Sequence, residues 1–228
     1  MTNYKIIVDE EKLDNFIEWL PDLEDSEVFY VQMFGRKKYL GQGTIQSGQQ
    51  SLNRFACKKN RIKEKLKQLE IPLGYYKNRE VVLPNECLAV YITPNPRCHE
   101  VAAKQLLKTL ADKITKKYEF YNTYQLAMTE IHKSCKRKLF VDFDFDNIDF
   151  EDISYDIAEY INLDAIKVLK TRGGFHLIVT LNKIRSEYSK TWYRDIDSLG
   201  PDVKGHQEML LPIPGCSNGG FCPYFLEI

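Results

Sequence analysis

The sequence lacks the features that would assign it to a membrane or secreted class. No apolar run approaches the roughly 20 residues that are needed to span a bilayer. Residues 1–8 carry no signal-peptide pattern, and the six cysteines include no CxxC pair. These absences favour a cytoplasmic protein without a membrane partner, whose cysteines are reduced thiols.

A zinc site would have to combine separate stretches of the chain. The candidate spacings are Cys98-His99, His132-x-x-Cys135 and Cys216-x5-Cys222. Structural zinc needs four such ligands, and reduced thiols in a cytosolic protein explain the same residues more simply. No zinc ion is therefore expected.

The net charge of zero, from 32 basic and 32 acidic residues, hides a segregation of charge along the chain. Residues 54–67 contain seven basic residues and one acidic residue, residues 133–138 contain four basic residues, and residues 140–159 contain eight acidic residues and no basic ones. A basic surface beside an acidic pocket suits a protein that holds polyanions near metal ions. Any one run alone is more often a solvated helix face. The candidate nucleic-acid contacts are Arg54, Lys58, Lys59, Arg61, Lys65, Lys136, Arg137 and Lys138.

Hydrophobic periodicity predicts an α+β fold with two modules that share one core. In residues 1–132, an N-terminal αβ module, it predicts strands at 4–8, 27–34 and 87–93 and helices at 9–20, 52–69 and 99–114. In residues 133–228 it predicts strands at 139–145, 166–170, 175–181, 209–213 and 221–227 and helices at 151–160 and 186–195. The second pattern is akin to an RNA-recognition motif (RRM), a sheet with helices on one face.

The stretch LFVDFDFD, which ends at Asp146, alternates carboxylates with apolar side chains. In an extended strand Asp142 and Asp144 share one face, while Phe143 and Phe145 share the other. Charges on a core strand are costly to desolvate, and a bound cation is the usual remedy. Mg²⁺ and Mn²⁺ prefer such hard oxygen ligands and often share them with substrate phosphates. Asp-x-Asp also arises by chance, and glycosyltransferases use it too.

The stretch KTRGGFHLIV, which begins at Lys170, predicts a phosphate contact. Gly173 and Gly174 let the backbone approach a ligand closely or turn with positive φ. Lys170 and Arg172 place two cations beside that turn. His176 begins a strand and points away from its buried face. A lone histidine is more often structural, but these neighbours favour a phosphate-binding role.

Three elements in this order resemble the catalytic core of the archaeo-eukaryotic primase superfamily, and viral and phage-type primase-polymerases are the most similar. The elements are LFVDFDFD, TRGGFHLIV and LLPIPGCSNGG, within residues 138–228. The resemblance implies an N-terminal αβ module packed on a C-terminal RRM-like module, with the active site in the cleft between them. It further implies a DNA-replication enzyme, a template-directed nucleotidyltransferase that joins nucleotides on single-stranded DNA with two Mg²⁺ or Mn²⁺ ions.

The resemblance also implies residue roles. Asp142 and Asp144 would bind the metals, and His176 would contact the phosphates of the incoming nucleotide. By charge and proximity, Lys170 and Arg172 join the nucleotide site with the Gly173-Gly174 turn. The chain departs from the family pattern at the third carboxylate, because no aspartate directly precedes PIPG. The preferred third metal ligand is Asp202, and the alternatives are Asp195, Asp197 and Glu208.

The implied partners are a single-stranded DNA template and an NTP or dNTP, for a virus- or phage-encoded enzyme in the host cytoplasm. The chain has no GxxxxGK[ST] motif, so a replicative helicase would be a separate chain or a missing domain. Three other interpretations stay open: a degenerate primase-like module that binds single-stranded nucleic acid, a glycosyltransferase that binds a nucleotide sugar through Mn²⁺, and a plain α/β binding domain.

Overall fold

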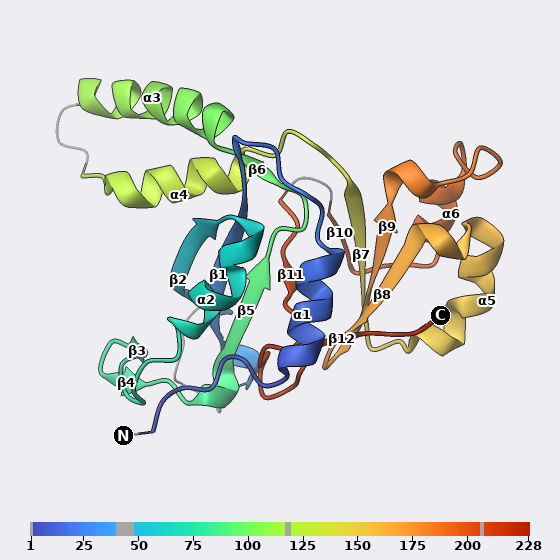
Figure 1. Ribbon diagram of the computed structural model, residues 1–228, viewed down its shortest axis with the longest axis horizontal. Helices are drawn as coiled ribbons and strands as arrows, with labels where there is room; N and C mark the ends of the chain where they lie inside the picture. The colour runs from blue at the N-terminus through green and yellow to red at the C-terminus, as the bar shows by residue number, and fades with distance from the viewer. Residues whose placement is uncertain (1, 40–47, 117–119, 206–207) are drawn as a thin grey trace.

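Two β-sheets organise the computed structural model, which describes residues 2–39, 48–116, 120–205 and 208–228 (Figure 1). The mixture of helices and sheet confirms the predicted α+β class. Short 3-10 helices connect several elements: η1 (Lys37–Tyr39), η2 (Lys59–Arg61), η3 (Asn85–Cys87), η4 (Leu163–Ala165) and η5 (Leu181–Lys183). In the described part of the chain no helix is long and apolar enough to cross a membrane.

The first sheet has the strand order β11-β5-β1-β2, and β6 also pairs with β1. Its strands are β1 (Glu27–Arg36), β2 (Gln49–Cys57), β5 (Leu88–Ile92), β6 (Arg97–Cys98) and β11 (Leu211–Pro212). A small separate hairpin consists of β3 (Lys77–Asn78) and β4 (Val81–Val82). Every strand pair in the first sheet is antiparallel.

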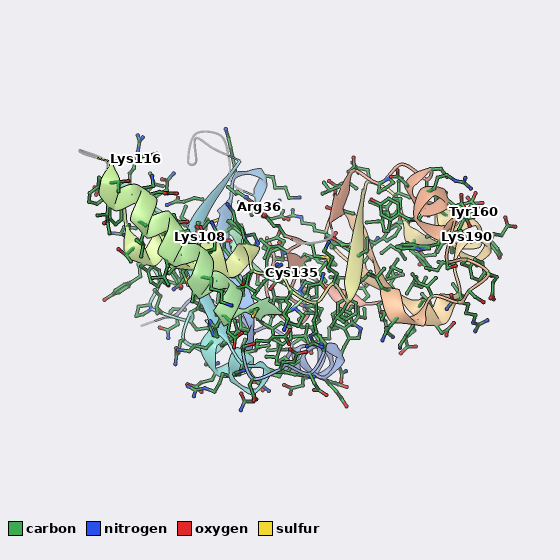
Figure 2. All side chains as sticks on the ribbon, turned by 90° about the horizontal axis from the view of Figure 1, so that it is seen from above. Arg36, Lys108, Lys116, Cys135, Tyr160 and Lys190 are labelled. Atoms are coloured by element: carbon green, nitrogen blue, oxygen red, sulfur yellow. The ribbon has the colours of Figure 1, made fainter. Side chains whose placement is uncertain are left out.

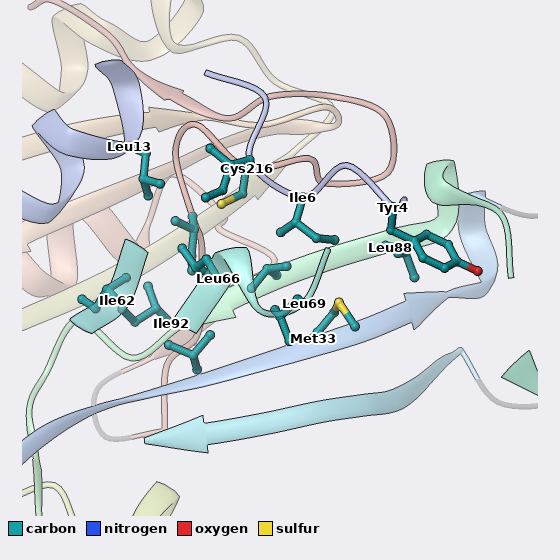
Figure 3. Close-up of a cluster of buried hydrophobic side chains, with 14 of the residues drawn as sticks. Tyr4, Ile6, Leu13, Met33, Ile62, Leu66, Leu69, Leu88, Ile92 and Cys216 are labelled. Atoms are coloured by element: carbon teal, nitrogen blue, oxygen red, sulfur yellow. The ribbon is translucent and has the colours of Figure 1, made fainter. Parts of the chain in front are cut away.

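Helices α1 (Glu10–Trp19) and α2 (Ile62–Lys67) cover one face of the first sheet (Figure 1). The Asp9 carboxylate accepts a hydrogen bond from the backbone N–H of Lys12, which caps the start of α1. Apolar residues at helical spacing then face the sheet and form its main core. Figure 3 shows part of this core: Tyr4, Ile6, Leu13, Met33, Ile62, Leu66, Leu69, Leu88, Ile92 and Cys216.

A helical hairpin extends from the first sheet, away from the second one (Figure 1). It consists of α3 (His99–Thr115) and α4 (Thr123–Lys133). Helix α4 contacts the sheet, where the ring of His132 packs against that of Tyr30 of β1. Helix α3 was predicted correctly, but its apolar stripe is not buried as the periodicity suggests. Leu107 and Ile114 are 69% and 70% exposed, because only one side of α3 has a partner in the described structure.

The second sheet has the order β10-β7-β9-β8-β12, again with antiparallel pairs. Its strands are β7 (Phe140–Asp146), β8 (Ile166–Lys170), β9 (Gly174–Thr180), β10 (Val203–Gly205) and β12 (Tyr224–Phe225). Helices α5 (Phe150–Tyr160) and α6 (Trp192–Asp197) pack on one face through an apolar core that includes Phe143, Phe145 and Ile196. Along the chain the elements run β7-α5-β8-β9-α6-β10.

The other face of the second sheet meets the first sheet. Phe140, Leu169 and Ile178 pack there with Met209 and Leu211, next to Trp19 of α1 and Phe225 of β12. The C-terminal segment thus contributes β11 to the first sheet and β12 to the second, which the division of the chain at residues 132 and 133 does not anticipate.

Three local predictions were wrong. The predicted helix 52–69 begins only at Ile62, because residues 49–57 form β2 and pair with β1 along its length. Tyr4, Ile6 and Ile7 are buried, but residues 4–8 form only an isolated bridge at Ile7 and no strand. The predicted helix 186–195 begins at Trp192. Tertiary pairing with β1 overrode the local helical pattern at residues 52–57, and β2, α4 and β10 were missed.

Candidate active site

The carboxylates of β7 lie on the sheet face opposite the helices. Phe143 and Phe145 enter the helix-covered core, so the intervening aspartates point to the other side, as the alternation predicts. The antiparallel register with β9 sets Asp144 directly opposite His176. The strand therefore brings the first two predicted motifs together on one face.

His176 lies between the first two carboxylates. Its Nδ1 is 3.1 and 3.0 Å from the two carboxylate oxygens of Asp142, and its Nε2 is 3.6 Å from Oδ1 of Asp144. Burial alone would lower the pKa of His176, but Asp142 and Asp144 outweigh it and raise that pKa to about 9. The imidazole is therefore protonated at neutral pH and donates from both nitrogens.

The second carboxylate is held in a strongly negative environment. Burial raises the pKa of Asp144, and the neighbouring Asp142 and Asp146 raise it further, while His176 opposes them. Three carboxylates on one strand face thus share one described imidazolium. A cation placed near Asp144 would relieve this repulsion.

A cavity of about 270 Å³ opens where the two sheets meet, and residues of both line it. Asp144, Asp146 and His176 form its acidic wall. Arg36, Lys38 and Arg172 contribute the cations. The remaining lining includes Phe34, Tyr39, Gln49, Tyr91, Thr171, Gly173, Leu210, Pro212, Asn218 and Pro223. The cavity therefore offers carboxylates for cations and cations for an anionic ligand.

The basic side chains of the cavity are held by specific contacts. Nη1 of Arg36 donates to Oε1 of Gln49 at 2.9 Å. Nη1 of Arg172 donates to the carbonyl oxygen of Gly219 at 2.6 Å, and its guanidinium lies 5.1 Å from the ring centroid of Tyr39. These contacts leave other guanidinium N–H groups of each arginine for a ligand.

The two glycines of the turn serve strand pairing. Neither has a positive φ. A Cβ on Gly174 would lie 1.9 Å from the carbonyl oxygen of Phe145, and one on Gly173 would lie 3.3 Å from Oδ1 of Asp146. Glycine is therefore required at position 174 because the backbone there approaches β7 closely. The prediction gave a different reason, which was close approach of the backbone to a ligand.

Lys170 does not line the cavity. Its Nζ pairs with the carboxylate of Asp149, which is on the loop before α5. Lys170 lies at the end of β8, beyond the pair of strands that carries the carboxylates. The structure therefore does not bring Lys170 together with His176 and Arg172 at the cavity.

The candidates for the third carboxylate occupy different places. Asp202 is exposed and adjoins β7: its N–H donates to the carbonyl of Asp144 at 2.8 Å, and its Oδ2 accepts from the N–H of Asp146 at 2.9 Å. Asp195 and Asp197 belong to α6, on the other side of the sheet from the β7 carboxylates. Glu208 is exposed and acts electrostatically on Arg97. None of these four lines the cavity.

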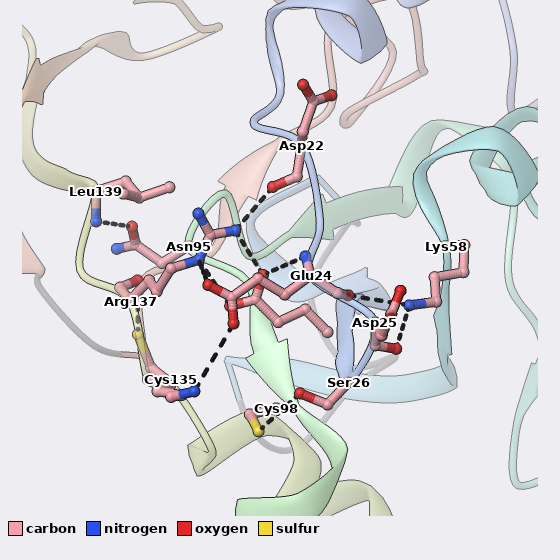
Figure 4. A network of polar contacts seen from close by, with 12 residues as sticks. Asp22, Glu24, Asp25, Ser26, Lys58, Asn95, Cys98, Cys135, Arg137 and Leu139 are labelled. Carbon is pink, nitrogen blue, oxygen red and sulfur yellow. Dashed lines mark hydrogen bonds and ion pairs between the residues drawn. The ribbon is translucent and has the colours of Figure 1, made fainter.

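Most of the predicted nucleic-acid contacts have partners within the protein. Lys58 donates to the carbonyls of Glu24 and Asp25, and Arg137 pairs with the buried Glu27 at 2.5 Å; Figure 4 shows this network. The others are held as follows: Arg54 by Tyr30, Lys59 by the carbonyls of Glu18 and Leu20, Arg61 by Glu64, Lys65 by Gln68, and Lys136 by Glu24. Only Lys138 has no such contact among the described residues.

The donor set fits a hard divalent cation in part. Asp144 and Asp146 present carboxylate oxygens to the cavity, as Mg²⁺ or Mn²⁺ requires. Both oxygens of Asp142, however, face His176. Within the described residues no group of three or more His, Cys, Asp or Glu side chains is arranged to hold a metal ion. Asp142 would join the ligands only in exchange for its contact with His176.

No family model, curated protein or solved structure matches the chain. The resemblance to primases stays a prediction, and the function has to be argued from the cavity itself. Sequence reasoning missed Arg36, Lys38 and Tyr39. The available signal was the basic run Arg36-Lys37-Lys38 at the end of a predicted strand.

Proposed function

We propose that the chain is a template-directed nucleotidyltransferase of the primase type. One observation carries the proposal: carboxylates on β7 face Arg36, Lys38 and Arg172 across one cavity. A nucleoside triphosphate with its divalent cation supplies the complementary charges, anions for the basic wall and cations for the acidic wall. Nucleotide binding is therefore the chemistry that this arrangement of charges favours.

Asp142 and Asp144 would hold Mg²⁺ or Mn²⁺, with either Asp202 or Asp146 as the third carboxylate. When bound, two such ions activate the attacking hydroxyl and stabilise the charge that develops at phosphorus. Asp146 lines the cavity, whereas Asp202 reaches the strand only through its hydrogen bonds with the backbone. Separate substitutions of Asp146 and Asp202 would decide between them.

The other residues of the cavity bind and orient the nucleotide. Arg36, Lys38 and Arg172 would bind the triphosphate, and preorganised cations of this kind lower the cost of aligning it. His176 holds the first two carboxylates in place as an imidazolium. With a cation bound to the carboxylates, the two N–H groups of His176 would donate to the phosphates of the nucleotide, as the resemblance implies.

The topology supports an RRM-like catalytic module. The order β7-α5-β8-β9-α6-β10, with helices on one face, is that of a split β-α-β module. Its open face adjoins the first sheet, so the cavity takes the place of the expected cleft. The proposed substrates are an NTP or dNTP and a single-stranded DNA template, and a helicase would belong to another chain or domain.

The test is incorporation of a labelled nucleotide on single-stranded DNA, with Mg²⁺ or Mn²⁺ and with or without a primer. Asp144→Asn should reduce incorporation at least 100-fold, because it removes the charge that faces the cavity. Asp149→Asn is the matched control, since Asp149 pairs with Lys170 outside the cavity. It should retain activity within a factor of two.

A wild-type chain without incorporation activity would contradict the proposal. DNA binding without incorporation would then favour the degenerate module, for which the contact of His176 with Asp142 is the supporting observation. Mn²⁺-dependent consumption of a nucleotide sugar would favour the glycosyltransferase.

A further inference from the structure

A second hollow, of about 370 Å³, lies between the two helices of the hairpin. Its cations are Lys104 and Lys108 of α3 and Lys133 of α4, and we name it the hairpin groove. Val101, Gln105, Glu130 and Ser134 complete its lining. Lys104 and Lys108 are four residues apart and therefore share one edge of α3. In Figure 2, Lys108 is on this hairpin, at the opposite end of the molecule from Tyr160 of α5.

The lysines of the hairpin groove lack the ion pairs that hold Lys63 and Lys67 of α2. None of the three has an acidic partner in the described part of the chain, whereas Lys63 pairs with Glu10 and Asp14 and Lys67 pairs with Glu70. Glu130, the one acidic side chain among the described residues of the groove, is buried and accepts a hydrogen bond from Thr109. Like charges four residues apart on a helix repel each other, and an anion in the groove would relieve that repulsion.

We infer that the hairpin groove binds the phosphate backbone of single-stranded DNA. The choice of DNA as the polyanion rests on the proposed function. Three cations around an open hollow can contact several phosphates of one strand. Binding of a phosphate backbone in this way needs no apolar anchor. A protein partner would usually bury an aromatic or aliphatic anchor in a pocket, and among the described residues that line the groove only Val101 is a large apolar side chain.

The chain connects the hairpin groove with the candidate active site. Directly after Lys133, residues 134–139 lead from α4 into β7, and Lys136 and Lys138 are exposed along this segment. A strand held in the groove would therefore continue past two further cations towards the carboxylates. The inferred binding surface thus keeps the predicted basic run at residues 133–138 and adds α3 in place of residues 54–67.

The test measures the affinity for a fluorescent oligo-dT by anisotropy, with EDTA and without nucleotide, at 50 to 200 mM salt. The triple variant K104A/K108A/K133A is compared with K63A/K65A/K67A, which removes the same charge from α2. Each phosphate contact on single strands contributes about 0.7 to the slope of log affinity against log salt. The groove variant should therefore lose about 2 units of slope. Over this fourfold range of salt, the wild-type affinity should fall roughly 20-fold further than that of the variant.

The control triple variant should keep the wild-type slope, and circular dichroism should show both variants folded. The inference is wrong if the groove variant binds like the wild type, or if only the α2 variant loses affinity. In either case a wild-type chain that still incorporates nucleotides leaves the proposed function intact. A wild-type chain that neither binds oligo-dT nor incorporates nucleotides overturns both. Loss of slope in the groove variant alone supports the inference.

Discussion

Replacing Asp142 with asparagine should destabilise the protein, although simple repulsion between carboxylates suggests the reverse. In the structure Asp142 is buried and faces the imidazolium of His176 at 3.0 Å. The pKa of His176 is raised from 6.5 to about 9. By linkage, a raised pKa gives stability that is complete below pH 6.5 and disappears as the pH rises through about 9. At pH 7 this contribution is roughly 2–3 kcal/mol.

Asp142→Asn should remove most of this contribution, since it leaves only the more distant Asp144 beside the imidazole. At pH 7 the expected loss corresponds to a fall in Tm of roughly 5–10 °C for a chain of this size. Between pH 6.5 and 9.5, in EDTA, the wild-type Tm should fall towards that of the variant.

The control for this experiment is Asp149→Asn, which breaks a more exposed pair and should cost at most about 1 kcal/mol. The reasoning is refuted if Asp142→Asn is as stable as the wild type at pH 7. It is equally refuted if the difference in Tm stays constant up to pH 9.5, because the imidazolium would then not be its source.

Three further predictions concern single residues. Arg137→Ala leaves the fully buried Glu27 without its cation and should cost about 3–5 kcal/mol in urea unfolding at pH 7; a loss below about 1 kcal/mol would contradict the pairing. Arg137 helps to lower the pKa of Glu27 below its usual 4.5, against the effect of burial. The difference in unfolding free energy between the wild type and Arg137→Ala should therefore shrink as the pH falls towards 4. Gly174→Ala places a Cβ 1.9 Å from the carbonyl oxygen of Phe145, so the soluble yield and the Tm should both fall, whereas Gly200→Ala, with open space around it but a positive φ, should be milder. Lys170→Ala should leave the affinity for a nucleoside triphosphate within twofold in calorimetry, and Arg36→Ala should weaken it at least tenfold; equal effects would argue against the assigned basic wall.

The strongest sequence patterns predicted the structure where local and tertiary preferences agree. The alternation in residues 139–146 correctly placed the carboxylates and Phe143 on opposite faces, because a pleated strand allows no other arrangement. The position of His176 opposite Asp144 follows from the pairing of β7 with β9. Helix α5 and strand β8 separate these strands along the chain, so sequence spacing does not specify their register.

The rest of the site depends on pairing between distant segments. Residues 52–57 look helical when taken with residues 58–69, but β1 offers them a strand partner. Arg36 and Lys38 reach the carboxylates only because the two sheets meet face to face, and no local motif marks that meeting. Basic runs likewise do not reveal which lysines have acidic neighbours. Lys63 and Lys104 look alike in sequence and differ in their partners.

The crossing of the C-terminal segment between the sheets sets an order for biosynthesis. Leu211 of β11 pairs with Ile92 of β5, and 211 − 92 gives a separation of 119 residues. At about 5–20 residues per second, a ribosome needs roughly 6–24 seconds to make that stretch. Until then β5 lacks its outer neighbour, and the core around Ile213 and Cys216 is open. The first sheet is therefore completed only after the carboxylate-bearing strand has been synthesised, and a nascent chain stalled before residue 211 would expose an unpaired strand edge to chaperones.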